Sequence, residues 1–279
     1  MHRTRRACRG PAPWMAALAM LLLLPGIALA EPQRDDPAAA PTLCLRPFDG
    51  AGPLGQLPPD WVPFSLQRDK SPTSYAMTQV DGRTVLEAVA DKSSSIVIWD
   101  REFNPRELNV LEWEWRVERS LPDDALHPEQ IEDAPARVMV FFSYDPARES
   151  VWDRMTYDAM KLVYGVYPPA RSMNYVWGKP NAPPTWLESR RTERVRSLVL
   201  PRGETGQWFR ERRDLAADFR AAFGDAELPT RARIAIMADT DATQSQVRSL
   251  FDAIVLGITP IPATAARETS PDGAVIPAN

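Results

Sequence analysis

Hydrophobic and charged residues alternate without interruption over residues 111–118, in the sequence LEWEWRVE. Successive side chains of a β-strand point to opposite faces, so this period of two predicts a strand with one apolar and one charged face. The apolar face carries Trp113 and Trp115, which we expect in the core together with Trp208. The charged face carries Glu112, Glu114, Arg116 and Glu118.

Further segments have the pattern of short strands separated by turns. Residues 137–144 (RVMVFFSY) are apolar at most positions, which predicts a strand buried on both faces. The pair Asp81-Gly82 lies between two alternating segments and predicts a hairpin. Many short strands with turns between them favour a mainly β protein, an antiparallel β-sandwich. The other predicted strands cover residues 75–80, 84–89, 94–99, 174–178, 195–200, 232–238 and 250–258.

Helical spacing occurs in two segments, which we expect at the periphery of the sandwich. Between Thr205 and Phe223 the apolar residues form one stripe, and Gly224 follows as a typical residue after a helix end. The arginines and acids interspersed in this segment indicate a solvated helix face. A second helix is predicted over residues 150–163, as an insertion between strands.

The N-terminus has the three-part pattern of a secretory signal peptide. Residues 3–9 are basic, residues 15–24 are apolar, and Ala28-Leu29-Ala30 is a cleavage signal. We therefore predict a signal peptide over residues 1–30, cleaved after Ala30, and a periplasmic or secreted protein. No other apolar run approaches the roughly 20 residues of a membrane span, so we expect a soluble mature chain without membrane contact. The predicted divisions after the leader are a flexible linker (31–43), a single sandwich domain (44–259) and a disordered tail (260–279).

Charge and residue counts exclude several classes of protein. Without its four leader arginines the chain has 29 basic and 37 acidic residues, a formal charge of −8, which largely excludes a nucleic-acid binder. Outside the leader there is one histidine, His127, and one cysteine, Cys44. These counts exclude a His-rich zinc site and an intrachain disulfide, and we expect His127 to lie solvated in a polar loop. No Gly-rich phosphate loop or dinucleotide fingerprint occurs, so no cofactor is predicted.

Several short motifs, taken together in order, resemble a known family. They are LPPDW at 57–61, LEWEW at 111–115, EDAPAR at 132–137, NYVWG at 174–178, GQW at 206–208, ERR at 211–213 and MADTD at 237–241. In this combination the chain resembles the bacterial exported domain of unknown function 3047, from about Phe48 to Gly257. The resemblance implies an exported β-sandwich of the jelly-roll kind, similar in outline to carbohydrate-binding modules. It implies no established reaction.

Two pairs of carboxylates are candidates for acid–base chemistry. Glu112 and Glu114 lie two residues apart on one strand face, about 6.5–7 Å from each other, which is in the range of inverting glycosidases. The alternative is a solvent-facing ladder neutralised by Arg116. Asp239 and Asp241 follow a predicted strand and suit either a metal ion or hydrogen bonds to turn amides and arginines.

Calcium is a separate alternative for the ends of the sandwich. A structural calcium ion could bridge Asp49, near the first strand, and Asp252, in the last, because hard cations prefer carboxylate oxygens. The sequence shows no further ligands for such an ion.

A ligand site on a sandwich needs aromatic faces for stacking and arginines for hydrogen bonding. Tyr175 and Trp177 share a strand face and suit either a binding platform or the core. The candidate ligand-binding residues are Arg137, Tyr175, Trp177, Arg212, Asp239 and Asp241. The favoured function is non-catalytic binding of a glycan or another cell-envelope polymer. The alternatives are a glycan hydrolase or lyase using paired carboxylates, and a structural envelope protein that meets other proteins; the oligomeric state stays open.

Overall fold

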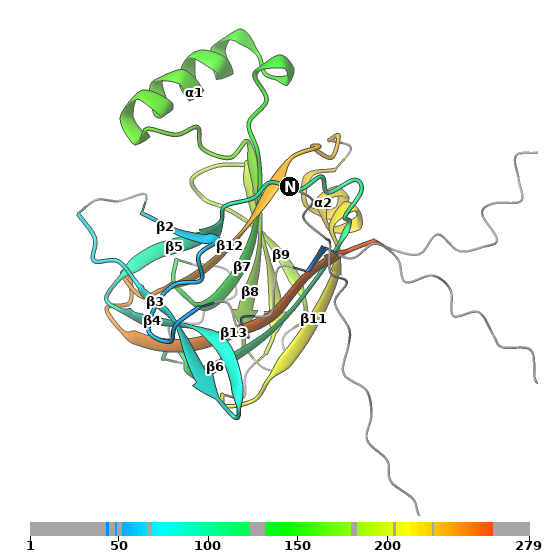
Figure 1. The fold of residues 1–279 in the computed structure, drawn as a ribbon. Helices are drawn as coiled ribbons and strands as arrows, with labels where there is room; N and C mark the ends of the chain where they lie inside the picture. Colours follow the sequence, from blue (N-terminus) through cyan, green and yellow to red (C-terminus); the bar gives the residue numbers. More distant parts are fainter. Residues whose placement is uncertain are drawn as a thin grey trace, which may run out of the picture.

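The alternating strands form two β-sheets that pack face to face through their apolar sides (Figure 1). The computed structural model describes residues 43–44, 48, 52–65, 69–122, 132–179, 183–202, 205–224 and 226–258. Within these residues the chain is mainly β, and the predicted β-sandwich is confirmed. The predicted signal peptide and C-terminal tail, His127 and Asp49 lie outside the described residues.

The first sheet, sheet A, has six strands. Its strands in spatial order are β11 (Phe209–Asp214), β6 (Val110–Arg119), β13 (Gln246–Gly257), β4 (Arg83–Asp91) and β3 (Ser74–Val80), and β1 (Leu43–Cys44) also pairs with β13. All of these pairs are antiparallel. The predicted Asp81-Gly82 hairpin joins β3 to β4, and both residues have positive φ, 53° and 77°, as a tight two-residue hairpin turn requires.

The second sheet, sheet B, has seven strands. Its strands in spatial order are β2 (Trp61–Phe64), β5 (Ser94–Trp99), β12 (Ala232–Asp239), β7 (Ala134–Phe142), β8 (Arg171–Gly178), β10 (Val195–Pro201) and β9 (Thr185–Glu188). Strands β8 and β10 run parallel, while the other pairs in this sheet are antiparallel. Strand β7 is buried along nearly its whole length, as the sequence predicts.

Aromatic side chains from both sheets fill the space between them. Trp113 and Trp115 of β6 are fully buried and meet edge to face, with ring centroids 5.4 Å apart. Across the interface, Tyr175 lies 5.0 Å from Trp113 and Trp177 lies 5.5 Å from Trp115. The expected core position of the β6 tryptophans is therefore confirmed, whereas Trp208 is only partly buried and stacks under Arg83, 4.7 Å away.

The predicted helix over 205–223 is half wrong, because its first part is strand β11. In this strand Phe209, Glu211 and Arg213 are more buried than the residues between them. The residues between them, Arg210 and Arg212, lie in register opposite Glu114 and Glu112 of β6. Cross-strand pairing of opposite charges thus replaces the helical pairs expected from the sequence. The chain becomes helical only at α2 (Leu215–Phe223), where Asp214 accepts two backbone N–H bonds as N-cap.

The predicted insertion helix is confirmed as α1 (Val151–Tyr164), which follows a short helical turn at Pro146–Arg148. Ser150 caps its start, and Gly165 ends it with a φ of 80°. Figure 1 shows α1 standing apart from both sheets, at one end of the molecule. No helix among the described residues has the length and apolar character needed to cross a membrane.

Candidate functional site

A cleft of about 430 Å³ lies on the outer face of sheet B, the face turned away from the sandwich core. Alternation along the strands decides which side chains reach it. On β12, Ile236 and Ala238 point into the core, while Met237 and Asp239 line the cleft. The cleft wall combines apolar side chains, such as Ile96 and Met237, with charged and amide groups.

Arg137 and Asp239 form a buried pair on the cleft wall. Arg137 of β7 is 9% exposed, and Asp239 at the end of β12 is 2% exposed. The Arg137 Nη2 lies 3.2 Å from the Asp239 Oδ1 and donates a bond of 2.9 Å to the Glu132 carbonyl. The Arg137 Nε, by contrast, is buried and has no hydrogen-bond partner among the described residues. An unsatisfied N–H on a buried guanidinium is costly, and Arg137 is one of the residues that line the cleft.

The Asp239 carboxyl holds its proton far more tightly than an ordinary aspartate. Burial raises the pKa of Asp239 from 3.8 to about 7; Arg137 opposes this rise, and the Asp133 carboxylate adds to it. The Ala134 N–H donates to the Asp239 Oδ1 at 2.9 Å and favours the ionised form. At neutral pH this group therefore titrates within the cleft.

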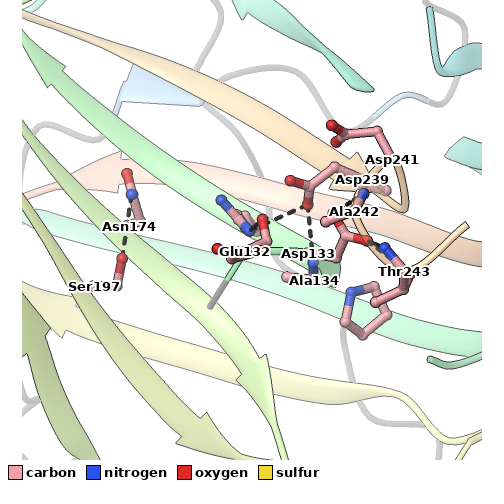
Figure 2. Close-up of polar contacts among 12 residues, drawn as sticks. Glu132, Asp133, Ala134, Asn174, Ser197, Asp239, Asp241, Ala242 and Thr243 are labelled. Atoms are coloured by element: carbon pink, nitrogen blue, oxygen red, sulfur yellow. Dashed lines mark hydrogen bonds and ion pairs between the residues drawn. The ribbon is translucent and has the colours of Figure 1, made fainter. Parts of the chain in front are cut away.

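Asp133, Asp239 and Asp241 gather their carboxylates at one edge of the cleft, with one oxygen of each within 4.8 Å of the others. Asp133 accepts bonds from the Thr243 N–H (2.6 Å) and the Thr243 hydroxyl (2.7 Å), and so fixes the turn after β12 (Figure 2). Asp241 forms an ion pair with Lys70. The carboxylates of this cluster are thus already bound by protein donors. This is the alternative to a metal ion that the sequence offers for Asp239 and Asp241.

Asn174 and Ser197 extend the polar wall across the parallel pair β8–β10. They lie opposite each other in register, and the Asn174 Nδ2 donates to the Ser197 Oγ at 3.3 Å (Figure 2). The Ser172 hydroxyl donates to the Asn174 Oδ1 at 2.7 Å. Sequence analysis missed this set, although Ser172 and Asn174 alternate with the apolar Met173 and Tyr175 and carry a period-two signal.

The structure brings together three of the six predicted ligand residues. Arg137, Asp239 and Asp241 all line the cleft. Tyr175 and Trp177 share a strand face, as expected, but that face is the core, where they are 0% and 1% exposed. Their neighbour Asn174 occupies the cleft side of β8, because successive residues of a strand point to opposite faces.

The sixth residue, Arg212, lies on sheet A, away from the cleft. It forms an ion pair with Glu112, as does Arg210. Burial alone would raise the pKa of Glu112, but hydrogen bonds from these two arginines outweigh it and lower the pKa. Because Glu114 also pairs with Arg83, at 2.6 Å, the carboxylates of β6 belong to a neutralised charge ladder.

One of the two carboxylates expected to bind calcium is instead paired with an arginine. Asp252 is 5% exposed and forms an ion pair with Arg83. The other carboxylate, Asp49, lies outside the described residues.

The fold and the cleft define a two-sheet β-sandwich with a polar pocket on the outer face of one sheet. The chain belongs to the family described as Protein of unknown function (DUF3047), whose model matches residues 59–255. Among curated proteins, none matches this chain in sequence.

Solved structures similar to the chain include carbohydrate-binding modules and glycoside hydrolases. One is the family 11 carbohydrate-binding module from Clostridium thermocellum in complex with a β-1,3-1,4-mixed-linked tetrasaccharide (9% identity, 78% of this chain and 96% of that chain covered, TM-score 0.39). Another is the family 30 module of the cellulosomal cellulase Cel9D-Cel44B of the same organism (10% identity, 79% and 99% covered, TM-score 0.38). A third is endoglucanase 3 of family GH12 from Trichoderma harzianum (6% identity, 78% and 96% covered, TM-score 0.34). Such values describe a general likeness in strand arrangement and carry no information on ligand or reaction.

Proposed function

We propose that this protein is an exported, non-catalytic glycan-binding protein that holds a neutral sugar in the cleft of sheet B. The observation that carries the proposal is the Arg137 Nε, a buried donor that has no partner among the described residues and belongs to a side chain on the cleft wall. A sugar hydroxyl would satisfy this donor. A fold that needed only stability would be better served by an apolar residue at this position.

The chemistry of the cleft suits hydroxyl groups better than a strongly charged ligand. Each sugar hydroxyl both donates and accepts, and the cleft offers donors (Arg137, Asn174) beside acceptors (Asp241, Ser197). The apolar Met237 surface suits the C–H faces of a sugar ring. Positive and negative side chains are interspersed, which disfavours a polyanion as well as a polycation.

A binding role is better supported than catalysis. Glycosidases need two carboxyl groups free to meet the substrate from opposite sides. In the cleft Asp133 is committed to the turn at Thr243, and Asp241 is paired with Lys70. Asp239 has the raised pKa of a general acid, but it is 2% exposed and accepts its bonds from the protein.

The test is binding of neutral and acidic oligosaccharides on a glycan array, followed by titration calorimetry. We expect the wild-type protein to bind at least one neutral glycan. Arg137→Lys, which keeps the charge but removes the Nε–H, should weaken binding at least tenfold. The matched control is Arg233→Lys on the neighbouring strand β12, outside the cleft and partly exposed.

Two results would refute the proposal. One is the absence of any glycan binding by the folded wild-type protein. The other is an Arg137→Lys variant that binds as tightly as the wild type. Circular dichroism of both variants checks that the fold is retained, and Asn174→Ala gives a second substitution on the cleft wall.

A further inference from the structure

Helix α1 exposes its hydrophobic residues to solvent. Trp152 is 78% exposed, Leu162 88% and Val163 67%. We call this surface the apolar strip of α1. Its members are Val151, Trp152, Met155, Leu162 and Val163.

The orientation of α1 is the reverse of that of an ordinary surface helix. At 100° per residue, the apolar strip covers a continuous arc of about 120°. The opposite side of the helix faces the body: Tyr157 is 4% exposed and stacks on Tyr144 at 4.0 Å, and Asp153 pairs with Arg194 at 2.8 Å. A helix of a soluble domain normally turns its apolar stripe inward, whereas the described residues leave the apolar strip of α1 uncovered.

A second copy of the chain could also cover the strip, and size-exclusion chromatography separates this case from binding to lipid.

A lipid surface matches the strip in shape and in charge. Because α1 stands apart from the sheets, a flat bilayer can reach its outer side without meeting the sandwich (Figure 1). Apolar side chains enter the boundary between headgroups and acyl chains without needing a complementary protein groove. Trp152 near the start and Tyr167 just after the end, 40% exposed, suit the interfacial positions that such rings prefer.

We propose that α1 is a membrane-surface helix that seats its apolar strip in the outer layer of a bilayer of neutral lipids. Its length is too short to span a bilayer, so it lies in the plane of the surface. The four charged residues of α1, Asp153, Arg154, Asp158 and Lys161, sum to zero, so apolar insertion rather than charge attraction provides the binding. The proposal differs from the expectation of a chain without membrane contact, which rests on the lack of long apolar runs, because a short amphipathic helix has no such run.

The experiment measures protection of α1 by phosphatidylcholine vesicles. Because the full chain also carries the apolar run 15–24, the readout is taken on the helix itself, as hydroxyl-radical oxidation of Met155 followed by mass spectrometry. Vesicles should reduce the oxidation of Met155 at least fivefold, in 0.05 M and in 0.5 M salt alike. The double variant Trp152→Ser with Leu162→Ser should lose this protection. The control is Leu54→Ser, an equally apolar and 53% exposed residue on the sandwich, which should retain it.

Three outcomes would overturn the proposal. The first is a Met155 that vesicles do not protect, and the second is protection that the double variant retains. The third is a Met155 already protected without lipid, since the strip would then be covered by the chain itself or by a second copy, which size-exclusion chromatography distinguishes. Protection that requires anionic lipid and disappears in 0.5 M salt would likewise refute apolar insertion.

Discussion

Replacing Asp239 by asparagine should remove a strong pH dependence from the stability of the fold. Asparagine keeps an amide oxygen for the Ala134 N–H and for Arg137 but cannot ionise. In the wild type, burial raises the pKa of Asp239 from 3.8 to about 7. In the unfolded chain the same carboxyl ionises near pH 3.9, as a free aspartate does.

The direction of the effect follows from where the proton is held more tightly. Between about pH 4 and pH 7 the folded protein keeps a proton on Asp239 that the unfolded chain has lost, so the free energy of unfolding falls as the pH rises through this range. Above about pH 7 both states are ionised and the contribution is constant. At about 1.4 kcal/mol for each pKa unit, the loss is of the order of 4 kcal/mol.

The assay is urea unfolding of wild type and Asp239→Asn at intervals from pH 4.5 to pH 8.5. The quantity compared is the difference between their free energies of unfolding, because contributions from other carboxylates cancel in it. This difference should shift by several kcal/mol in favour of the variant as the pH rises to 7, and then level off. Asp60→Asn, which removes a carboxylate that is 47% exposed, is the control. Parallel profiles for wild type and Asp239→Asn would refute the role given to burial of this carboxyl.

Three further substitutions test the packing described above, each by urea unfolding at pH 7. Gly178→Ala should destabilise by about 1–3 kcal/mol, because the added Cβ would press on Val199 and lie 3.0 Å from a backbone oxygen of β10. Trp113→Ala should cost about 3–5 kcal/mol, whereas truncating an exposed tryptophan of α1 should cost almost nothing. Glu211→Ala should cost about 1.5–3 kcal/mol, because it leaves the buried Trp115 N–H and the half-buried Arg202 without their acceptor; a loss below 0.5 kcal/mol would contradict that role.

Most of the fold was predictable because its strands carry their own burial pattern. Residues 111–118 alternate with a period of two, and residues 138–142 are continuously apolar, and both patterns favour a strand with a buried face. The Asp81-Gly82 turn was predictable for an equally local reason. Strand β11 was not, because its arginines pair as well with acids along a helix as with Glu112, which lies about a hundred residues earlier in the chain. Only the residues that this segment meets in the folded protein decide between a helix and a strand.

The candidate site was predictable in part, for a related reason. Arg137 and Asp239 stand at the ends of two apolar segments, where a change from apolar to charged residues is visible in one sequence. The pairing of Asp133 with Thr243 depends on a contact between residues 110 positions apart. No local pattern contains that contact.

The burial of Tyr175 and Trp177 changes the kind of recognition that the cleft can perform. Both faces of β8 are buried, so the strand does not reveal by itself whether its rings or its amides face the outside. The amides do: Asn174 lies in the cleft, and the rings pack on Trp113 and Trp115. If the cleft binds a glycan as proposed, recognition depends on hydrogen bonds from a preformed polar wall. Such a wall rejects a ligand that leaves its buried groups unpaired more strongly than a stacking surface does. In the proposed glycan-binding role, the Arg137 Nε is the group on which selectivity depends most, because it has no partner among the described residues when the ligand lacks the matching oxygen.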